Sequence, residues 1–233
     1  MLVTEVLPGS GERTDAATPE GRAWLARRYA RDDRGYVRVN MITTLTGAAA
    51  GADGTSDTLT NRVDRAILGV IRADADVVVV GAQTVRAEGY VLPRRSRLAV
   101  VSTSGNLAGH RLSLDPDGTD DQVLVILPAG APAPPALHGL TVVRLPGEGP
   151  IAASGIVAAL TGRGLRRIVC EGGPSLASQF AGAGLVDEFC VTAAPALVPA
   201  ASPFLDLAER IATEPVGMLV DEDGFSYLRL QRP

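Results

Sequence analysis

The chain has 233 residues, of which 46% are hydrophobic and only 4% aromatic, and its formal net charge is −4 at pH 7. The length suits one domain with a short appendage, and the aliphatic composition predicts a core of Val, Leu, Ile and Ala, as in a sheet covered on both faces. The negative charge argues against a nucleic-acid-binding surface. The sequence contains no lysine, which excludes Schiff-base and P-loop lysines and leaves arginine and backbone N–H groups to bind any phosphate.

The first 33 residues are predicted to form an appendage of one short strand and one helix. Leu2–Leu7 is a short apolar run, and a Gly-, Ser- and Thr-rich stretch follows it. Thr18 and Pro19 are typical of an N-cap and a first helical residue, so we expect a helix to begin there and to continue to Tyr29. Residues 34–233 are then the main domain.

The main domain alternates short β-branched runs with helical patterns, which predicts an α/β sheet. Residues 36–42 and the valine run 76–80 are expected to be strands, and residues 61–72 carry apolar side chains at helical spacing. A turn with a glycine at 221–224 is typical of a hairpin, so we expect a mostly parallel sheet that ends in antiparallel strands. The remaining strands are expected at residues 98–101, 123–127, 140–145, 167–170 and 187–194, and the remaining helices at 83–88, 152–160 and 172–183.

Nothing in the sequence indicates secretion or membrane insertion. Cys170 and Cys190 each lie within an apolar run, where buried thiols are more common than a disulfide or a metal site. The N-terminal residues lack the basic start and apolar run of a signal peptide, and no apolar stretch approaches membrane length. We therefore expect a cytoplasmic protein with neither a membrane nor a nucleic-acid partner.

Three strand ends carry sequences suited to ligand binding, and the carboxyl ends of parallel strands meet at one edge of a sheet. The first is Glu171-Gly172-Gly173-Pro174-Ser175, which follows a predicted strand and opens a helix. Two glycines allow close approach of the backbone, and a helix N-terminus offers N–H groups to a pyrophosphate, while the carboxylate of Glu171 suits sugar hydroxyls. A tight turn with a solvated glutamate explains the motif equally well.

The second motif, residues 81–88, follows the valine run. Thr84 can donate a hydroxyl hydrogen bond and Arg86 can pair with a phosphate, although an ordinary capped helix with a surface Arg and Glu is the simpler explanation of this motif alone. The third motif, residues 40–47, leads into a Gly-rich loop. Its hydroxyls suit a polar pocket, and they also suit threonines at a strand end, where their β propensity is favourable.

Other candidate sites are weaker. Arg94 and Arg95 can hold a phosphate or form a solvated loop face, and His110 and His138 have no partners at metal-ligand spacing, so no metal site is expected. The sequence contains no GxSxG elbow, no GxxxxGK[ST] loop and no GxGxxG fingerprint, which argues against common hydrolases, P-loop NTPases and a Rossmann fold.

Together and in this order, the motifs resemble the reductase domain of the bifunctional riboflavin-biosynthesis pyrimidine deaminase/reductases. The matching segments are residues 44–47, 54–56, 81–88, 171–174, 184–188 and 194–195. The resemblance implies a dihydrofolate-reductase-like, three-layer α/β/α sandwich, NADPH as the hydride source and a homodimer. It also implies that the substrate is a phosphorylated ribosylaminouracil whose ribose is reduced.

The resemblance further implies roles for individual residues. Glu171 and Thr46 are expected at the catalytic positions, and Thr103 near the adenosine 2′-phosphate of the cofactor. The residues expected at the cofactor are Thr84, Arg86, Glu88, Thr103, Gly172, Gly173, Pro174, Ser175 and Leu176. The residues expected at the substrate are Asn40, Thr44, Ser56, Arg72, Leu92, Arg95 and Glu171.

Two positions depart from the family pattern, because Thr46 and Glu88 each stand where the family has Asp. At position 46 a carboxylate can orient a substrate or relay a proton, whereas a hydroxyl only forms neutral hydrogen bonds. Two alternatives therefore stay open. One is a reductase of the same fold that acts on another heterocycle, such as a pterin or dihydrofolate. The other is an NADPH-binding protein without turnover.

Overall fold

The computed structural model describes residues 1–31, 35–87, 90, 92–110, 112, 122–132, 140–147, 149–199 and 202–233. Its strands are β1 (Leu2–Leu7), β2 (Arg13–Asp15), β3 (Tyr36–Thr44), β4 (Val77–Gly81), β5 (Arg97–Val101), β6 (Val123–Pro128), β7 (Leu140–Leu145), β8 (Arg167–Gly172), β9 (Glu188–Ala194), β10 (Glu214–Asp221) and β11 (Ser226–Gln231). The helices are α1 (Pro19–Tyr29), α2 (Arg62–Asp74), α3 (Ala82–Ala87), α4 (Ala153–Thr161) and α5 (Pro174–Gly182).

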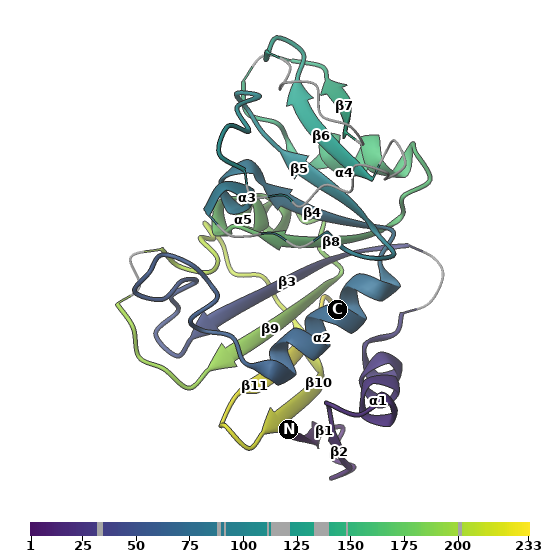
Figure 1. The fold of residues 1–233 in the computed structure, drawn as a ribbon, viewed down its shortest axis with the longest axis vertical. Coiled ribbons are helices and arrows are strands. Elements are labelled where there is room, and N and C mark those ends of the chain that lie inside the picture. Colours follow the sequence, from purple (N-terminus) through teal and green to yellow (C-terminus); the bar gives the residue numbers. More distant parts are fainter. Residues whose placement is uncertain are drawn as a thin grey trace.

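All of these strands belong to one sheet, in the order β2-β1-β10-β11-β9-β3-β8-β4-β5-β6-β7 (Figure 1). From β9 to β7 the neighbouring strands pair in parallel, and from β2 to β9 they pair antiparallel. The predicted mostly parallel sheet with an antiparallel C-terminal hairpin, here β10 and β11, is therefore confirmed.

The predicted helix at residues 172–183 begins two residues later in the structure. Gly172 still belongs to β8, where it pairs with Val80 of β4, and Pro174 is the first residue of α5. Proline suits this first position because the N–H of a first helical residue has no acceptor within the helix, so proline loses no hydrogen bond there.

The valine run in β4 explains why the sheet needs cover on both faces. The side chains of Val77, Val78, Val79 and Val80 are all fully buried. Because side chains alternate along a strand, Val77 and Val79 pack on one face of the sheet, and Val78 and Val80 pack on the other.

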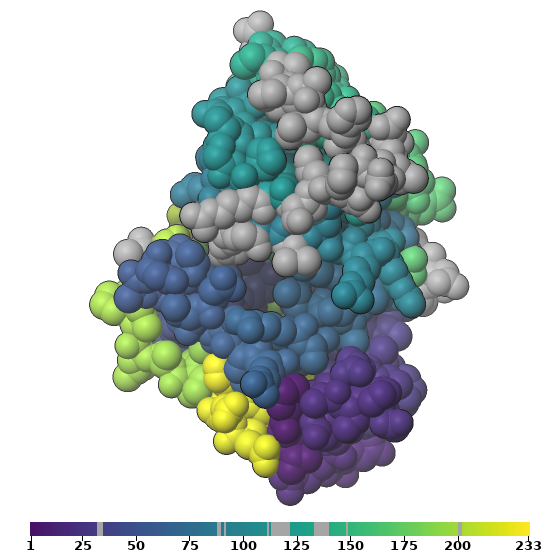
Figure 2. Space-filling view, in the orientation of Figure 1, coloured from purple at the N-terminus to yellow at the C-terminus, as the bar shows by residue number. Residues whose placement is uncertain are grey.

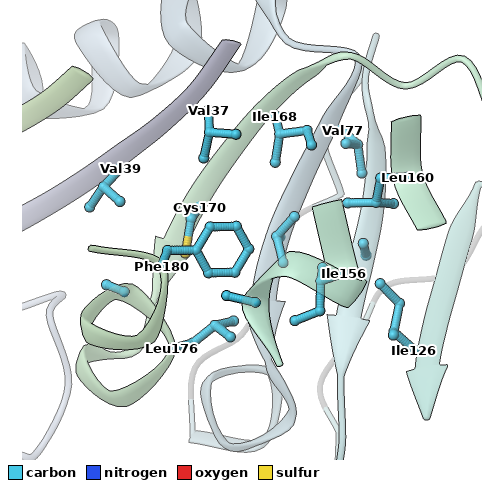
Figure 3. Close-up of a cluster of buried hydrophobic side chains, with 14 of the residues drawn as sticks. Val37, Val39, Val77, Ile126, Ile156, Leu160, Ile168, Cys170, Leu176 and Phe180 are labelled. Carbon is cyan, nitrogen blue, oxygen red and sulfur yellow. The ribbon is translucent and has the colours of Figure 1, made fainter. Parts of the chain in front are cut away.

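Helices α4 and α5 cover the first of these faces (Figure 3). Phe180 of α5 lies beside Cys170 of β8, and Ile156 and Leu160 of α4 project onto the same strands (Figure 3). Both cysteines are buried free thiols, in line with their apolar sequence context.

Helices α1, α2 and α3 cover the opposite face, which completes the three layers of a dihydrofolate-reductase-like sandwich. Helix α2 buries Val63, Ile67 and Ile71, a stripe at helical spacing that leaves its other sides free for polar residues. Asn61 caps this helix, since its side chain accepts a hydrogen bond from the N–H of Asp64 at 2.9 Å.

The predicted appendage contributes to the same sheet and the same core. Strand β1 pairs with β10, and β2 pairs with β1, so both lie at the antiparallel end of the sheet (Figure 1). Trp24, Leu25 and Tyr29 of α1 are buried in the cluster that includes α2. In the described part of the chain, no helix combines the length and apolar character that a membrane crossing requires.

Candidate active site

A cleft of about 910 Å³ opens where the carboxyl ends of β3, β4, β5 and β8 meet. Figure 2 shows this face hollowed beside the blue surface of the segment that precedes and includes α2. Helices α2, α3 and α5 border the cleft. Its polar lining residues include Asn40, Ser56, Asp57, Thr60, Asp64, Arg65, Arg72, Gln83, Thr84, Arg86, Tyr90, Ser102, Thr103, Ser104, Glu171, Ser175, Gln179 and Ser202.

Two of the predicted motifs touch each other at the floor of the cleft. The backbone N–H of Gly173 donates a hydrogen bond to the hydroxyl of Thr84 at 3.0 Å, which joins the turn after β8 to the turn after β4. Gly172 has a φ of +94°, and a Cβ there would lie 2.8 Å from the sulfur of Met41. Only glycine fits that position. The Gly172–Gly173 peptide bond is cis.

The start of α5 faces the cleft without side-chain cover. Gly173 is the N-cap, no side chain of the described residues caps the helix, and Pro174, Ser175 and Leu176 line the cleft. Among the described residues, a Cβ built on Gly173 would meet only the Thr84 hydroxyl, at 3.5 Å, so no other described atom crowds the backbone at this point. Uncapped N–H groups at a helix N-terminus attract anions, and a bare backbone lets a diphosphate come close.

On the opposite side of the turn, Glu171, Arg72 and Tyr90 form a compact hydrogen-bonded group. Nε of Arg72 donates to Oε1 of Glu171 at 2.7 Å, and Nη2 of Arg72 donates to Oε2 at 2.6 Å and to the Tyr90 hydroxyl at 2.8 Å. The Tyr90 hydroxyl in turn donates to Oε2 of Glu171. The arginine also lies over the tyrosine ring, with 4.9 Å between the guanidinium carbon and the ring centroid.

Arg72 stays positively charged at neutral pH. Burial alone would lower the pKa of Arg72, but the hydrogen bonds and the negative charge of Glu171 more than offset burial and raise the pKa above its usual value. Burial, and then the charge of Glu171, raise the pKa of Tyr90 well above its ordinary value. Tyr90 is therefore a hydrogen-bond donor and no source of protons near pH 7.

A second carboxylate, Asp64, lies in the cleft on α2. Its Oδ1 accepts a hydrogen bond from the Thr192 hydroxyl of β9, and its Oδ2 accepts one from the Thr60 hydroxyl, both at 2.6 Å. Burial raises the pKa of Asp64, although the two hydroxyl groups act in the opposite direction. Asp64, Leu68 and Arg72 recur one turn apart and line the cleft together.

The loop after β5 supplies a group of hydroxyls. Ser102, Thr103 and Ser104 line the cleft, and Thr103 and Ser104 are exposed. Arg86 of α3 reaches toward this loop, because its Nη1 donates to the backbone oxygen of Asn106 at 2.7 Å. The predicted residues Arg86 and Thr103 therefore lie along the same side of the cleft.

At the end of β3, the predicted residues separate into two groups. Asn40 and Ser56 line the cleft. Thr44 accepts the N–H of Ala48 at 3.0 Å and is 2.9 Å from the hydroxyl of Thr46, and that hydroxyl donates to the backbone oxygen of Val198. Thr44 and Thr46 thus join two loops and are not among the described residues that line the cleft.

The remaining predicted residues lie elsewhere. Leu92 and Arg95 are not among the lining residues, and Arg95 is exposed. Gly172 is not among the lining residues either, and Glu88 falls outside the described residues. Asp64, Arg65 and Tyr90 also line the cleft and were not predicted from the sequence. The position of Asp64 two turns before Arg72 is a signal that helical spacing could have supplied, whereas no pattern points to Tyr90.

Known proteins that are similar to this chain support the same family. Residues 35–212 match the RibD C-terminal domain family. Comparison with curated proteins found no match. Among solved structures, a pyrimidine reductase-like protein from Corynebacterium diphtheriae is similar, with a TM-score of 0.68, 23% identity and coverage of 85% of this chain and 92% of the other.

Two further structures share the fold at lower identity. One is the deaminase/5-amino-6-(5-phosphoribosylamino)uracil reductase of Thermotoga maritima, with a TM-score of 0.69, 18% identity and coverage of 90% of this chain and 60% of the other. The other is the riboflavin biosynthesis reductase Rib7 of Saccharomyces cerevisiae, with a TM-score of 0.65, 12% identity and coverage of 93% and 99%. The chain belongs to the RibD C-terminal domain family, the family of the riboflavin-biosynthesis pyrimidine reductases.

Proposed function

We propose that the protein is an NADPH-dependent reductase that acts on a ribosylaminopyrimidine-type substrate similar to 5-amino-6-(5-phosphoribosylamino)uracil. One observation carries the proposal: the uncapped start of α5, bare at Gly173, opens onto the same cleft as the group formed by Arg72, Glu171 and Tyr90. The first feature suits a diphosphate and the second suits a polar substrate beside it. NADPH supplies the hydride when it is bound, so the chain itself needs to bind, orient and exclude water.

The residues at the start of α5 fit the diphosphate of a dinucleotide. Among the described residues, only the Thr84 hydroxyl lies within 4 Å of a Cβ built on Gly173. Ser175 supplies the free N–H of the first turn, because Pro174 has none and the N–H groups of Leu176 and Ala177 donate to the backbone oxygen of Gly173. Thr84 accepts the N–H of Gly173 and retains its own hydroxyl proton, which it can donate to a phosphate oxygen. Leu176 adds apolar lining beneath the same site.

The preference for NADPH over NADH is assigned to the loop after β5. Arg86 carries a permanent positive charge, and the exposed hydroxyls of Thr103 and Ser104 lie on the same side of the cleft. A 2′-phosphate needs a cation and several hydrogen-bond donors, and these three side chains supply both.

The sugar of the substrate is assigned to Glu171. Among the described residues, Oε1 of Glu171 accepts a hydrogen bond only from Arg72, so the oxygen can accept one more from a sugar hydroxyl. Arg72 neutralises the carboxylate and, with Tyr90, fixes its orientation. The predicted contacts of Leu92 and Arg95 require a substrate that extends beyond the lining of the cleft.

Asp64 favours a second candidate, a reductase of the same fold that acts on a pterin-like ring. Such a ring has N–H groups that can donate hydrogen bonds to a carboxylate. Position 46 carries a threonine where the family has Asp, but Asp64 supplies a carboxylate in the cleft. The same assays test this candidate and the other alternative that the sequence leaves open, an NADPH-binding protein that catalyses no reaction.

The test combines binding with turnover. NADPH fluorescence is titrated with protein, and NADPH consumption is followed with the ribosylaminouracil phosphate and with dihydrofolate. Binding with turnover of the first compound supports the proposal, turnover of dihydrofolate alone supports the second candidate, and binding without any turnover contradicts both. We also propose a cytoplasmic homodimer, as the resemblance implies, which light scattering of the purified protein and fractionation of cells would test.

A further inference from the structure

The two oxygens of the Glu171 carboxylate have different surroundings. Oε2 accepts hydrogen bonds from Nη2 of Arg72, at 2.6 Å, and from the hydroxyl of Tyr90. Among the described residues, Oε1 accepts only from Nε of Arg72, at 2.7 Å. Because a carboxylate oxygen has about two acceptor positions, Oε2 is filled and Oε1 retains one position.

Tyr90 completes a closed ring of hydrogen bonds around Oε2. Nη2 of Arg72 has two protons, of which one goes to Oε2 and the other to the Tyr90 hydroxyl at 2.8 Å. The hydroxyl donates its single proton to Oε2. Burial and the charge of Glu171 raise the pKa of Tyr90 well above its ordinary value, so the hydroxyl remains a donor near pH 7.

The aromatic ring of Tyr90 is held in place by its packing. The side chain is 6% exposed and belongs to the buried cluster that contains Val80, Val85 and Leu107. The guanidinium of Arg72 lies over the same ring, with 4.9 Å to the ring centroid. The hydroxyl therefore cannot move away from Oε2 without disturbing the core, and a ligand in the cleft has only the open position on Oε1.

The number of open acceptor positions decides how a carboxylate binds a sugar. A ribose carries neighbouring hydroxyls at its 2′ and 3′ positions, and a carboxylate with both oxygens open can accept one hydroxyl on each oxygen. A carboxylate with one open position accepts only one of them. Removal of a hydroxyl that has a buried partner is costly, because the partner is left unpaired, whereas removal of a hydroxyl without a partner costs little.

We propose that Tyr90 limits Glu171 to a single sugar hydroxyl, so that binding depends on one of the two neighbouring hydroxyls of the substrate ribose and tolerates loss of the other. This inference rests on the proposed reductase function and specifies how its sugar is recognised. Glu171 contacts the sugar, and Tyr90 determines specificity by occupying Oε2. Tyr90→Phe removes only the oxygen that fills Oε2, so Glu171 is then expected to accept both hydroxyls.

A purely structural role for Tyr90 makes a different prediction. In that case Tyr90 only anchors its loop to the core, and its replacement lowers stability and weakens binding of every form of the sugar by the same factor. The ratio between the dissociation constants of two sugar forms cancels such a general loss. The ratio therefore separates the two roles.

The experiment uses the full chain and three compounds, the ribosylaminouracil phosphate and its 2′-deoxy and 3′-deoxy forms. Calorimetry in saturating NADP⁺, which cannot donate a hydride, gives the dissociation constant of each. In the wild type, one deoxy form is expected to bind at least about tenfold more weakly than the ribosyl form, and the other within about threefold of it. In Tyr90→Phe, both deoxy forms are expected to bind at least about tenfold more weakly than the ribosyl form.

Tyr36→Phe is the matched control. Tyr36 is also a buried tyrosine that donates to a carboxylate, that of Asp74 at 2.8 Å, and Arg38 lies over its ring at 5.0 Å. Tyr36 is not among the described residues that line the cleft, so this variant is expected to retain the wild-type pattern. Tyr90→Leu is a second variant that leaves more room beside Oε2, and thermal unfolding shows whether each variant is folded.

Three results would overturn the inference. The first is a similar loss of affinity for both deoxy forms in the wild type. The second is an unchanged pattern in Tyr90→Phe and Tyr90→Leu, and the third is a change in Tyr36→Phe equal to that in Tyr90→Phe. Absence of binding of all three compounds would overturn it as well.

Turnover of the ribosyl form with NADPH separates this inference from the proposed function. If NADPH is consumed but the two deoxy forms bind alike in the wild type, the inference about Tyr90 fails and the reductase stands. If the expected pattern is found and depends on Tyr90, but no NADPH is consumed, the reductase fails and the inference about Tyr90 stands.

Discussion

The N–H of Gly173 donates to the hydroxyl of Thr84 at 3.0 Å, and this bond fixes the turn before α5 to the first turn of α3. Two motifs that lie 89 residues apart in the chain thereby form one wall of the cleft. The same contact leaves the Cα of Gly173 as the part of the turn that faces the cleft without a side chain.

Gly173→Val is expected to weaken NADPH binding by at least about tenfold, because a β-branched side chain would occupy the place assigned to the diphosphate. Gly173→Ala, whose Cβ would lie 3.5 Å from the Thr84 hydroxyl, is expected to have a smaller effect in the same direction. Fluorescence titration measures both. Gly182→Ala at the other end of α5 adds a Cβ with no atom within 4 Å and should bind NADPH as the wild type does. Unchanged affinity in Gly173→Val would refute the diphosphate site.

Glu171→Ala is expected to lower kcat/KM for the substrate by about a hundredfold and to change the dissociation constant of NADPH by less than about threefold. The variant removes the sugar acceptor and leaves Arg72 partly buried without its partner. Steady-state kinetics and NADPH titration provide the two values. Glu209→Ala, an exposed glutamate, serves as the control. An equal loss of substrate use and cofactor binding would contradict the assignment of Glu171 to the substrate.

Arg86→Gln is expected to raise the dissociation constant of NADPH by about tenfold and to leave that of NADH unchanged, since only NADPH carries the 2′-phosphate. The ratio of the two constants is the informative quantity, because it cancels any general loss of folding. Arg163→Gln is the control, since Arg163 is an exposed arginine outside the cleft lining whose side chain, like that of Arg86, donates to a backbone oxygen, here at 3.0 Å. If the variant binds NADPH and NADH more weakly by the same factor, Arg86 does not bind the 2′-phosphate.

Glu188 makes the fold sensitive to acid. Burial alone would raise the pKa of Glu188, but the positive charges of Arg38 and Arg229 outweigh burial and lower it below the ordinary value of 4.5. Because the folded state holds this proton less tightly than the unfolded chain, the stabilisation is complete above pH 4.5 and is lost as the pH falls through the lower folded pKa.

Glu188→Gln is expected to lower the free energy of unfolding at pH 7 by about 3–5 kcal/mol, because Arg38 is left fully buried without its counter-charge. Urea unfolding at pH 7 and pH 4 should show a smaller difference between the two pH values in this variant than in the wild type. Glu209→Gln should lose stability on acidification as the wild type does. An identical pH dependence in Glu188→Gln would exclude Glu188 as the acid-sensitive group.

Much of the fold was predictable because its signals are local. The valine run of β4, the apolar stripe Val63, Ile67 and Ile71, and the turn at 221–224 each determine an element from neighbouring residues. The pairing of β1 with β10 was not predictable, because strand partners more than 200 residues apart leave no local pattern.

Motifs at strand ends predicted that Thr84, Glu171 and Gly173 lie at one edge of the sheet, and these residues line one cleft together with Thr103, which the family resemblance indicated; their roles remain a proposal. Asp64 and Tyr90 were missed because their importance depends on which face of α2, and which point of a loop, meets the cleft. Thr44 and Thr46 show the converse: a motif placed them at a pocket, and their hydroxyls instead hold backbone groups of neighbouring loops.

Strand β1 pairs with one side of β10 at four positions. Strand β2, only three residues long, pairs with β1 and forms the outer edge of the sheet at this end. A protein shortened to residues 34–233 would present the free N–H and C=O groups of β10 as a long open border. An exposed edge strand can pair with strands of other molecules. We therefore expect the shortened protein to aggregate even if its cleft remained intact.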